Sequence, residues 1–148
     1  MSESKVNPIP KGYNRVIPYL ISTDVPRIMD FLKEVFDAEE IERMQTPDGT
    51  VMHGEMRIGD SVIMMSEARE ELEPMPIMLY MYVEDVDSVY KKALDFGMES
   101  VREPKDEFYG DRSCGVKDHS GNQWWIATHV ENLSSEEIQK RTMEQRKG

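Results

Sequence analysis

The chain has 148 residues, enough for one ordinary domain or two very small ones, and a single cysteine, Cys114, too few for an internal disulfide or a thiolate zinc site. Its 29 acidic and 18 basic residues give a net charge of −11, which disfavours nucleic acid as a partner because phosphate backbones are bound by Lys and Arg. No stretch approaches the roughly 18 to 20 apolar residues of a membrane-spanning helix, and residues 1–10 lack a signal-peptide pattern, so we expect no membrane partner and a cytoplasmic location.

The first half of the chain predicts the order β-α-β-β-β. Residues 1–12 contain Pro8, Pro10 and Gly12 and few apolar side chains, which indicates a flexible N-terminal lead-in. The first module covers residues 13–66, and its helix can be capped by Thr23 or Asp24 and carries apolar residues at helical spacing. The expected strands, rich in β-branched or aromatic residues or bounded by turn signals, are Tyr13–Ile21, Glu40–Met44, Val51–Ile58 and Ser61–Ser66.

The second half predicts the same order after a linker at residues 67–76. In the second module, residues 77–131, a helix capped by Asp85 or Asp87 and ended by Gly97 follows the first strand. The expected strands are Ile77–Val83, a segment around Val101, Gly115–Lys117 and Asn122–Thr128. Residues 132–148 form a C-terminal tail helix, because Ser134 and Glu137 have the spacing of a capping box.

The two halves align at a fixed offset. Placing Asp24 on Asp85 gives an offset of 61 residues (85 minus 24), and the same offset relates the first strands and the last strands of both modules. An internal duplication is the simplest explanation. The expected fold class is therefore α+β, with two tandem βαβββ modules forming curved mixed sheets, plus a C-terminal helix.

Three phrases in the sequence carry a resemblance. They are Met52-His53-Gly54-Glu55-Met56-Arg57-Ile58-Gly59-Asp60-Ser61, Phe108-Tyr109-Gly110-Asp111-Arg112 and Asp118-His119-Ser120-Gly121-Asn122-Gln123-Trp124. With the paired modules, they make the chain resemble the glyoxalase I, bleomycin-resistance and extradiol dioxygenase superfamily, also called vicinal oxygen chelate proteins, and within it the PhnB-like branch. The resemblance implies that each module curls into half of a cup and that two modules, often from two subunits, enclose one pocket. It therefore implies a homodimer.

The resemblance also implies where a divalent metal ion would be held. Its four ligand positions fall on Ile17, Met64, Met78 and Trp125, and the offset of 61 relates these residues in pairs. None of the four side chains offers the carboxylate, imidazole or thiolate donor that such ions require. We therefore expect no metal site and no cofactor.

Strand alternation predicts the wall of the pocket. If Met78 faces the cup, Tyr80 and Tyr82 face it too, because every second residue of a strand shares a face. The loop before the last strands adds a glycine and an arginine that can grip a carboxylate or phosphate, although Asp111 can instead pair with Arg112 or cap the turn. The expected ligand-binding residues are Ile17, Met64, Met78, Tyr80, Tyr82, Tyr109, Arg112 and Trp125, with a closed apolar core as the alternative.

Candidates for acid–base chemistry are His53, Glu55 and His129. His53, Glu55 and Arg57 alternate on one strand and so project from one face, while His129 ends the last strand on the predicted cup face. A carboxylate beside an imidazole can set its tautomer and raise its basicity. Alternating polar residues are equally typical of a half-exposed strand.

Three functions follow from this pattern. The first is a dimeric protein that binds a small organic molecule in a largely apolar, metal-free cavity at the subunit interface. The second is a lyase or isomerase with a non-standard acid–base or metal site around His53, Glu55 and His129. The third is a non-catalytic structural protein, which would have no cavity.

Overall fold

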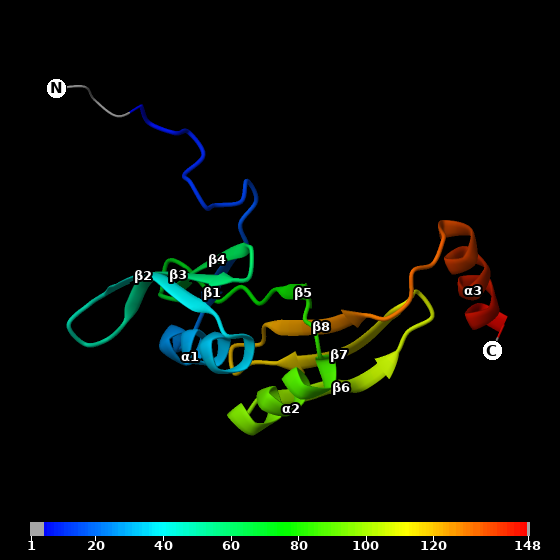
Figure 1. Ribbon diagram of the computed structural model, residues 1–148. Helices are drawn as coiled ribbons and strands as arrows, with labels where there is room; N and C mark the ends of the chain where they lie inside the picture. Colours follow the sequence, from blue (N-terminus) through cyan, green and yellow to red (C-terminus); the bar gives the residue numbers. More distant parts are fainter. Residues whose placement is uncertain (1–4, 148) are drawn as a thin grey trace. The chain divides into compact units, whose positions relative to one another are not determined.

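The computed structural model describes residues 5–147 and divides between Met75 and Pro76 into two parts, which we call unit 1 and unit 2 (Figure 1). The ends of the expected lead-in and tail, residues 1–4 and 148, lie outside the described residues. Unit 1 contains β1 (Tyr19–Ser22), α1 (Val25–Phe36), β2 (Glu39–Gln45), β3 (Val51–Ile58) and β4 (Ser61–Glu67). Unit 2 contains β5 (Met78–Tyr82), α2 (Val86–Phe96), β6 (Glu99–Asp106), β7 (Asp111–Lys117), β8 (Gln123–His129) and α3 (Ser135–Lys147). The predicted α+β class with two tandem modules and a C-terminal helix is confirmed.

Each unit carries one four-stranded mixed sheet with the same strand order. The order is β1-β4-β3-β2 in unit 1 and β5-β8-β7-β6 in unit 2. The first pair in each sheet is parallel and the other two pairs are antiparallel. Tyr19 pairs with Met64 in unit 1, and Tyr80 pairs with Trp125 in unit 2, so both partners differ by the sequence offset of 61. The register therefore matches the repeat found in the sequence.

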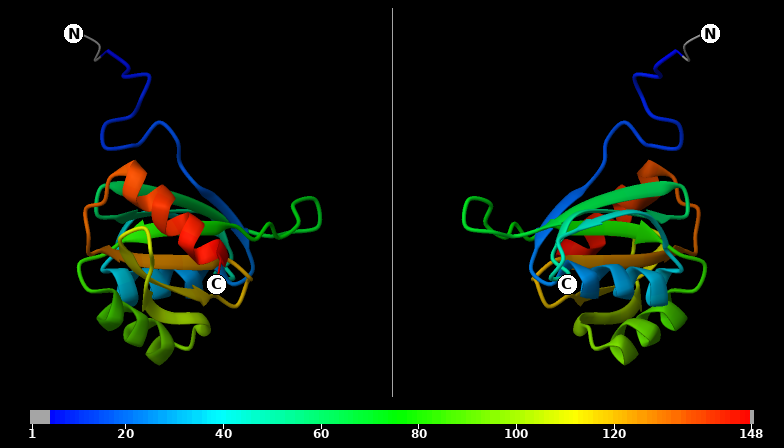
Figure 2. Two further views of the ribbon diagram at one scale, coloured as in Figure 1. Left: turned by 90° about the vertical axis from the view of Figure 1, so that its right-hand side faces the viewer. Right: turned by 90° about the vertical axis from the view of Figure 1, so that its left-hand side faces the viewer.

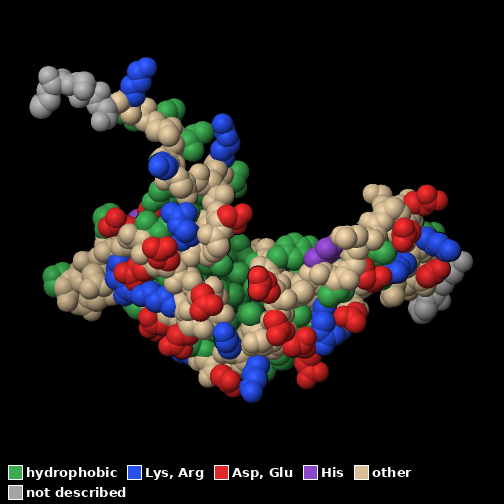
Figure 3. Space-filling view, in the orientation of Figure 1, with side chains coloured by type: hydrophobic (Ala, Val, Ile, Leu, Met, Phe, Trp, Pro, Cys, Tyr) green, Lys and Arg blue, Asp and Glu red, His purple; other side chains and the backbone are tan. Residues whose placement is uncertain are grey.

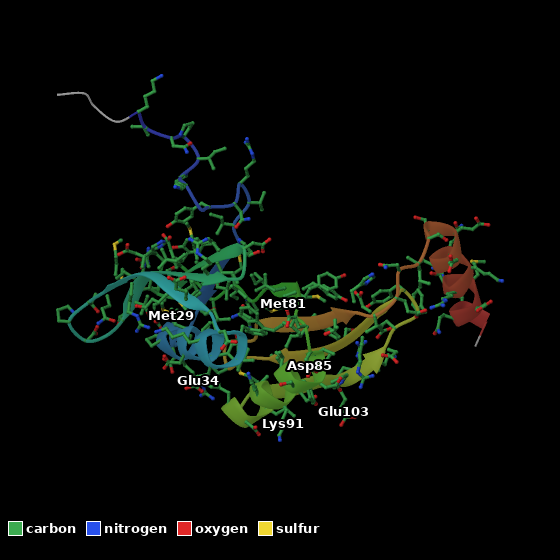
Figure 4. The ribbon with its side chains drawn as sticks, in the orientation of Figure 1. Met29, Glu34, Met81, Asp85, Lys91 and Glu103 are labelled. Carbon is green, nitrogen blue, oxygen red and sulfur yellow. The ribbon has the colours of Figure 1, made fainter. Side chains whose placement is uncertain are left out.

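The two main helices begin in different ways. At the start of α2, the Asp85 carboxylate accepts a hydrogen bond from the Ser88 backbone N–H (3.3 Å), as the sequence predicts, and Gly97 ends the helix at a φ of 109°. At the start of α1, Asp24 has a left-handed backbone with a φ of 47° and makes no side-chain cap. Asp85 is labelled in Figure 4, at the beginning of α2.

One face of each sheet is buried against the helix of its own unit. Alternation is clear on β8, where Trp124 and Ile126 are fully buried while Gln123 and Trp125 are partly exposed. In unit 1, Gly54 lets the Met29 side chain of α1, labelled in Figure 4, approach closely, since a Cβ there would lie 3.1 Å from the Met29 sulfur. Glu55 and Met64, which pair across β3 and β4, consequently project from the face opposite α1.

The first strand is shorter than the sequence predicts. The strand expected at Tyr13–Ile21 begins only at Tyr19, since Pro18 has no N–H to donate to a ladder. Residues before it still form hydrogen bonds with backbone N–H groups of β4. The Asn14 side chain accepts from the Val62 N–H (3.1 Å), and the Pro18 carbonyl accepts from the Met64 N–H (3.0 Å). This irregular segment is consequently held against β4, although it is not part of strand β1.

The tail helix α3 is tied to unit 2 by polar contacts. The predicted capping box is present, because the Glu137 N–H donates to Ser134 Oγ at 3.1 Å. Arg141 donates to the Phe108 carbonyl and to both oxygens of Glu131, at 3.1 to 3.3 Å. Figure 2 shows α3 in red from two further sides. Among the described residues, no helix has both the length and the apolar character needed to cross a membrane.

Candidate functional site

Unit 1 has an open cavity of about 520 Å³ beside its sheet. The segment before β1 contributes Pro8–Pro10, Tyr13–Arg15 and Ile17 to its wall, while β3 contributes Glu55 and β4 contributes Met64. Ile17, Glu55 and Met64 were candidates from the sequence, and the structure brings them to one cavity. Pro8–Pro10, Tyr13 and Asn14 were missed, because a loop without apolar periodicity carries no signal of where it packs.

Glu55 is the centre of a hydrogen-bond chain at this cavity. The Tyr13 hydroxyl donates to Glu55 Oε1 at 2.5 Å, and His53 Nε2 lies 2.7 Å from Glu55 Oε2. The Tyr19 hydroxyl lies 3.1 Å from His53 Nδ1. An imidazole protonated on Nε2 alone satisfies both contacts of His53, since it donates to Glu55 and accepts from Tyr19. The predicted His53–Glu55 contact is therefore present, and Tyr13 and Tyr19 extend it.

The charge of Glu55 is set by two opposing effects. Burial works to raise the pKa of the carboxyl, whose residue is only 8% exposed, but hydrogen bonds from Tyr13 and His53 outweigh it. The pKa of Glu55 therefore lies below its usual value, and the carboxylate is ionised at neutral pH. The same hydrogen bond, followed by burial, raises the pKa of Tyr13, which keeps its hydroxyl protonated.

In unit 2, Asp111 is the centre of a second cluster. It is 3% exposed, and its carboxylate accepts from the hydroxyls of Tyr80 (2.7 Å) and Tyr82 (2.9 Å) and contacts His129 Nδ1 at 2.9 Å. His129 Nε2 also lies 2.9 Å from the side-chain oxygen of Asn132. His129 thus contacts a carboxylate in unit 2, whereas His53 and Glu55 belong to unit 1. Asp111 is neither a turn cap nor the partner of Arg112, the two roles that the sequence suggested.

The pKa values in this cluster follow from the shared carboxylate. Burial works to raise the pKa of Asp111, but hydrogen bonds from His129, Tyr80 and Tyr82 outweigh it and lower it. The Asp111 carboxylate, and then Asn132, raise the pKa of His129 above its usual value. Burial, followed by the bond to Asp111, raises the pKa of Tyr80. The cluster therefore favours an ionised carboxylate and a protonated imidazole.

Trp125 lies between a glycine and an arginine. A Cβ added at Gly115 would lie 3.0 Å from three ring atoms of Trp125, so only glycine allows the ring to lie flat on β7. The Arg102 guanidinium carbon lies 4.9 Å from the ring centroid, and its Nη1 is 2.7 Å from Glu107 Oε1. Gly115 and Arg102 were missed, because their importance arises from cross-strand pairing on β6 and β7.

Arg112 forms ion pairs on the side of the sheet opposite the Asp111 cluster. Its guanidinium donates to both oxygens of Asp87 on α2, at 2.8 and 2.9 Å, and to Asp106 at 3.3 Å. Because Arg112 follows Asp111 on β7, its side chain points to the opposite face of the sheet, toward α2. This bidentate pairing corrects the expectation that Arg112 is available to grip a ligand. The Tyr109 ring instead packs edge-on against Phe108, with centroids 5.2 Å apart.

The four positions that the resemblance assigns to metal ligands carry side chains that do not suit a metal ion. Ile17 and Met64 line the unit 1 cavity, and Met78 and Trp125 lie on β5 and β8 of unit 2. Alkyl, thioether and indole groups are poor donors for Mg, Mn, Ni or Zn. Within residues 5–147, no three His, Cys, Asp or Glu side chains converge as metal ligands would. The donor set therefore does not fit a divalent ion.

Comparison with known proteins identifies a family. Residues 13–126 match the model of the Glyoxalase/Bleomycin resistance protein/Dioxygenase superfamily. An uncharacterized protein of Mycobacterium bovis is 29% identical over 133 residues, which make up 82% of this chain and 88% of that protein. An uncharacterized protein of Mycobacterium tuberculosis has the same identity, over 82% of this chain and 78% of its own length. The match spans both units.

Two solved structures with the same fold are TioX and a fosfomycin resistance protein. TioX from Micromonospora sp. ML1 has a TM-score of 0.67 at 24% identity and covers 79% of this chain and 99% of its own. The fosfomycin resistance protein FosX from Listeria monocytogenes, solved with Mn(II) and sulfate, has a TM-score of 0.63 at 21% identity, covering 87% of this chain and 97% of its own. At these identities the likeness shows the fold alone.

Proposed function

The chain belongs to the glyoxalase/bleomycin resistance protein/dioxygenase superfamily, and from that premise we propose that it binds a small organic molecule in a largely apolar cavity without a metal ion. One observation carries the proposal: Ile17 and Met64, at two positions that correspond to metal ligands, line a cavity of about 520 Å³ in unit 1. That volume lies in the range of roughly 300 to 1,000 Å³ that is usual for small-molecule sites. A purely structural protein has no need of such a cavity.

A binding experiment with a blocked cavity tests this proposal. The probe is 4-phenylbutan-1-ol, a neutral molecule with about eleven non-hydrogen atoms, for which roughly millimolar affinity is expected at about 0.3 kcal/mol per atom. Met64→Trp fills the cavity with the side chain that β8 carries at the equivalent position, Trp125. Calorimetry is expected to show at least about a tenfold loss of affinity in this variant.

The matched control is Met44→Trp, because Met44 is exposed on β2 of the same sheet and does not line the cavity. This control is expected to bind the probe as the unaltered protein does. Equal binding by the Met64→Trp variant would show that the probe occupies another place, and the proposal would then be wrong.

Metal independence has its own test. Protein treated with EDTA is titrated with Ni²⁺, Mn²⁺ and Zn²⁺ in a calorimeter. We expect no stoichiometric tight binding, since Ile17, Met64, Met78 and Trp125 lack suitable donors. Uptake of one ion per chain at micromolar concentration would contradict the proposal.

We also propose that unit 2 binds the apolar part of a ligand on a face of its own, which carries Trp125, Tyr80 and Tyr82. The Trp125 ring offers a large flat apolar surface, held by Gly115 and Arg102. Trp125→Ala is expected to weaken probe binding, through loss of an apolar contact of about 2 to 4 kcal/mol if the probe buries the ring. If calorimetry gave equal affinities for the unaltered protein and Trp125→Ala, Trp125 would not be part of the proposed site.

We propose in addition that the protein is a cytoplasmic homodimer of the PhnB-like branch. The phrase from Tyr109 to Arg112 and the one from Asp118 to Trp124 support this branch. So does one structural neighbour, a PhnB protein from Bacillus cereus with a TM-score of 0.63 at 17% identity.

Proton-transfer catalysis is the second candidate, favoured by one imidazole–carboxylate contact in each unit. These are His53 with Glu55 at 2.7 Å and His129 with Asp111 at 2.9 Å. Such a lyase or isomerase would exchange the protons beside a carbonyl group with solvent. The test incubates 4-phenylbutan-2-one with protein in deuterated water and measures deuterium uptake by mass spectrometry. Uptake that is lost in His53→Gln or His129→Gln supports catalysis, and uptake at the rate of buffer alone excludes it for this probe.

A further inference from the structure

We propose that the ligand of the unit 1 cavity carries a cationic nitrogen on an apolar body, with the nitrogen bound at Glu55. The inference rests on the proposed function, because it names the class of molecule for the same cavity. It is carried by the position of one carboxylate in an otherwise largely apolar wall.

Glu55 has hydrogen-bond capacity left for a ligand. Among the described residues that line the cavity, it is the one carboxylate, and it is only 8% exposed. Tyr13 occupies one position on Oε1 and His53 occupies one on Oε2. An ionised carboxylate accepts about four hydrogen bonds, so two positions remain for donors from a molecule in the cavity.

The charge of this carboxylate selects the ligand. Hydrogen bonds from Tyr13 and His53 keep Glu55 ionised in spite of burial, but within the described residues no Lys or Arg side chain forms an ion pair with it. A buried carboxylate without a cationic partner is unfavourable. An ammonium or amidinium nitrogen would supply the missing charge together with N–H donors, and a charge-assisted bond of this kind is stronger than a neutral one.

The rest of the wall suits the same molecule. The ring of Tyr13 also lines the cavity, and the face of an aromatic ring attracts a cation. Ile17, Met64 and the segment Pro8–Pro10 offer an alkyl, thioether and pyrrolidine surface for an apolar body. The wall therefore combines one carboxylate with an alkyl, thioether and aromatic surface, beside the polar Asn14 and Arg15.

An anionic ligand fits less well, although Arg15 also lines the cavity. Arg15 is exposed, so water screens its charge more than that of Glu55, which is buried. A carboxylate or phosphate placed in the cavity would meet Glu55 as a like charge. The net charge of −11 also favours the approach of cations, and acidic side chains lie among basic ones on the face drawn in Figure 3.

Three probes of matched shape test the inference: 4-phenylbutylamine, 4-phenylbutan-1-ol and 4-phenylbutanoate. Calorimetry at neutral pH is expected to give about tenfold tighter binding of the amine than of the alcohol, and the weakest binding for the carboxylate. In Glu55→Gln the amine is expected to lose this advantage and to bind no tighter than the alcohol does to the same variant. Glu42→Gln is the control, because Glu42 pairs with Glu55 across β2 and β3 but does not line the cavity.

A second variant keeps the test decisive if Glu55→Gln fails to fold. Tyr13→Phe retains the ring and removes one donor to Glu55, so the preference for the amine is expected to persist or grow. Equal affinities for amine and alcohol in the unaltered protein, or tighter binding of the carboxylate, would overturn the inference and leave the cavity proposal standing. Failure of all three probes to bind would instead contradict the proposed function itself.

Discussion

Asp111 shows how one buried carboxylate can organise a surface. It gathers two tyrosine hydroxyls and the imidazole of His129, and every one of these partners comes from a different position on β5 or β8. The sequence could not reveal this cluster, because Asp in a Tyr-Gly-Asp-Arg phrase is equally typical of a turn. Its role emerges only when β7 pairs with β8, which places Asp111 directly opposite His129.

This cluster predicts a pH dependence of stability. The pKa of His129 is raised in the folded protein, so its contribution is fully present below about pH 6.5, the usual value for histidine, and is lost as pH rises through the folded-state pKa. The difference in urea midpoint between the unaltered protein and His129→Gln is therefore expected to be larger at pH 5.5 than at pH 9. A difference that stays constant or grows with pH would contradict the assignment.

At the scale of single elements, glycines make the clearest prediction. Gly110 has a φ of 99°, and a Cβ there would lie 2.6 Å from the Glu131 carbonyl oxygen. Gly49 has a similar φ of 90° with no atom within 4 Å of the added Cβ. Both Ala variants carry the backbone cost of roughly 1 to 2 kcal/mol, but only Gly110→Ala also forces the chain before α3 to move.

We expect the free energy of unfolding, measured in urea, to fall further in Gly110→Ala than in Gly49→Ala, by at least about 1 kcal/mol. The Gly49→Ala variant is the control for backbone strain alone. Equal losses in the two variants would contradict the predicted clash between the added Cβ and the Glu131 carbonyl oxygen.

Local signals in the sequence predicted most elements, and their failures have physical causes. Asp85 lies three residues before Ser88, so its capping bond is readable from spacing, whereas the left-handed backbone of Asp24 is not. Residues 13–17 have strand-like composition, yet Pro18 and the Asn14 side chain turn them into part of a cavity wall. Alternation grouped Glu55 with His53 because side chains in strands repeat every second residue, whereas the cross-strand pairing of Glu55 with Met64 appears only in the structure.

At the scale of the whole molecule, exposed apolar side chains support the proposed homodimer. Met78 and Tyr82 of β5 are 63% and 62% exposed, although strands usually bury such residues. In a dimer with two-fold symmetry, the same face of each subunit would be covered by the other subunit. Light scattering at micromolar concentration is expected to give twice the mass of one chain. The mass of a single chain would contradict the proposed homodimer.

We propose that a small organic molecule occupies the unit 1 cavity without a metal ion. The most direct test is NMR of protein labelled with [¹³C-methyl]methionine, titrated with 4-phenylbutylamine in EDTA. Met64 lines the cavity, whereas Met29 and Met65 are fully buried in unit 1 and serve as internal controls. We predict a saturable shift of the Met64 methyl resonance, identified by its loss in Met64→Leu, with little change at Met29 and Met65. An unmoved Met64 resonance, or a shift that requires added divalent metal, would contradict the claim.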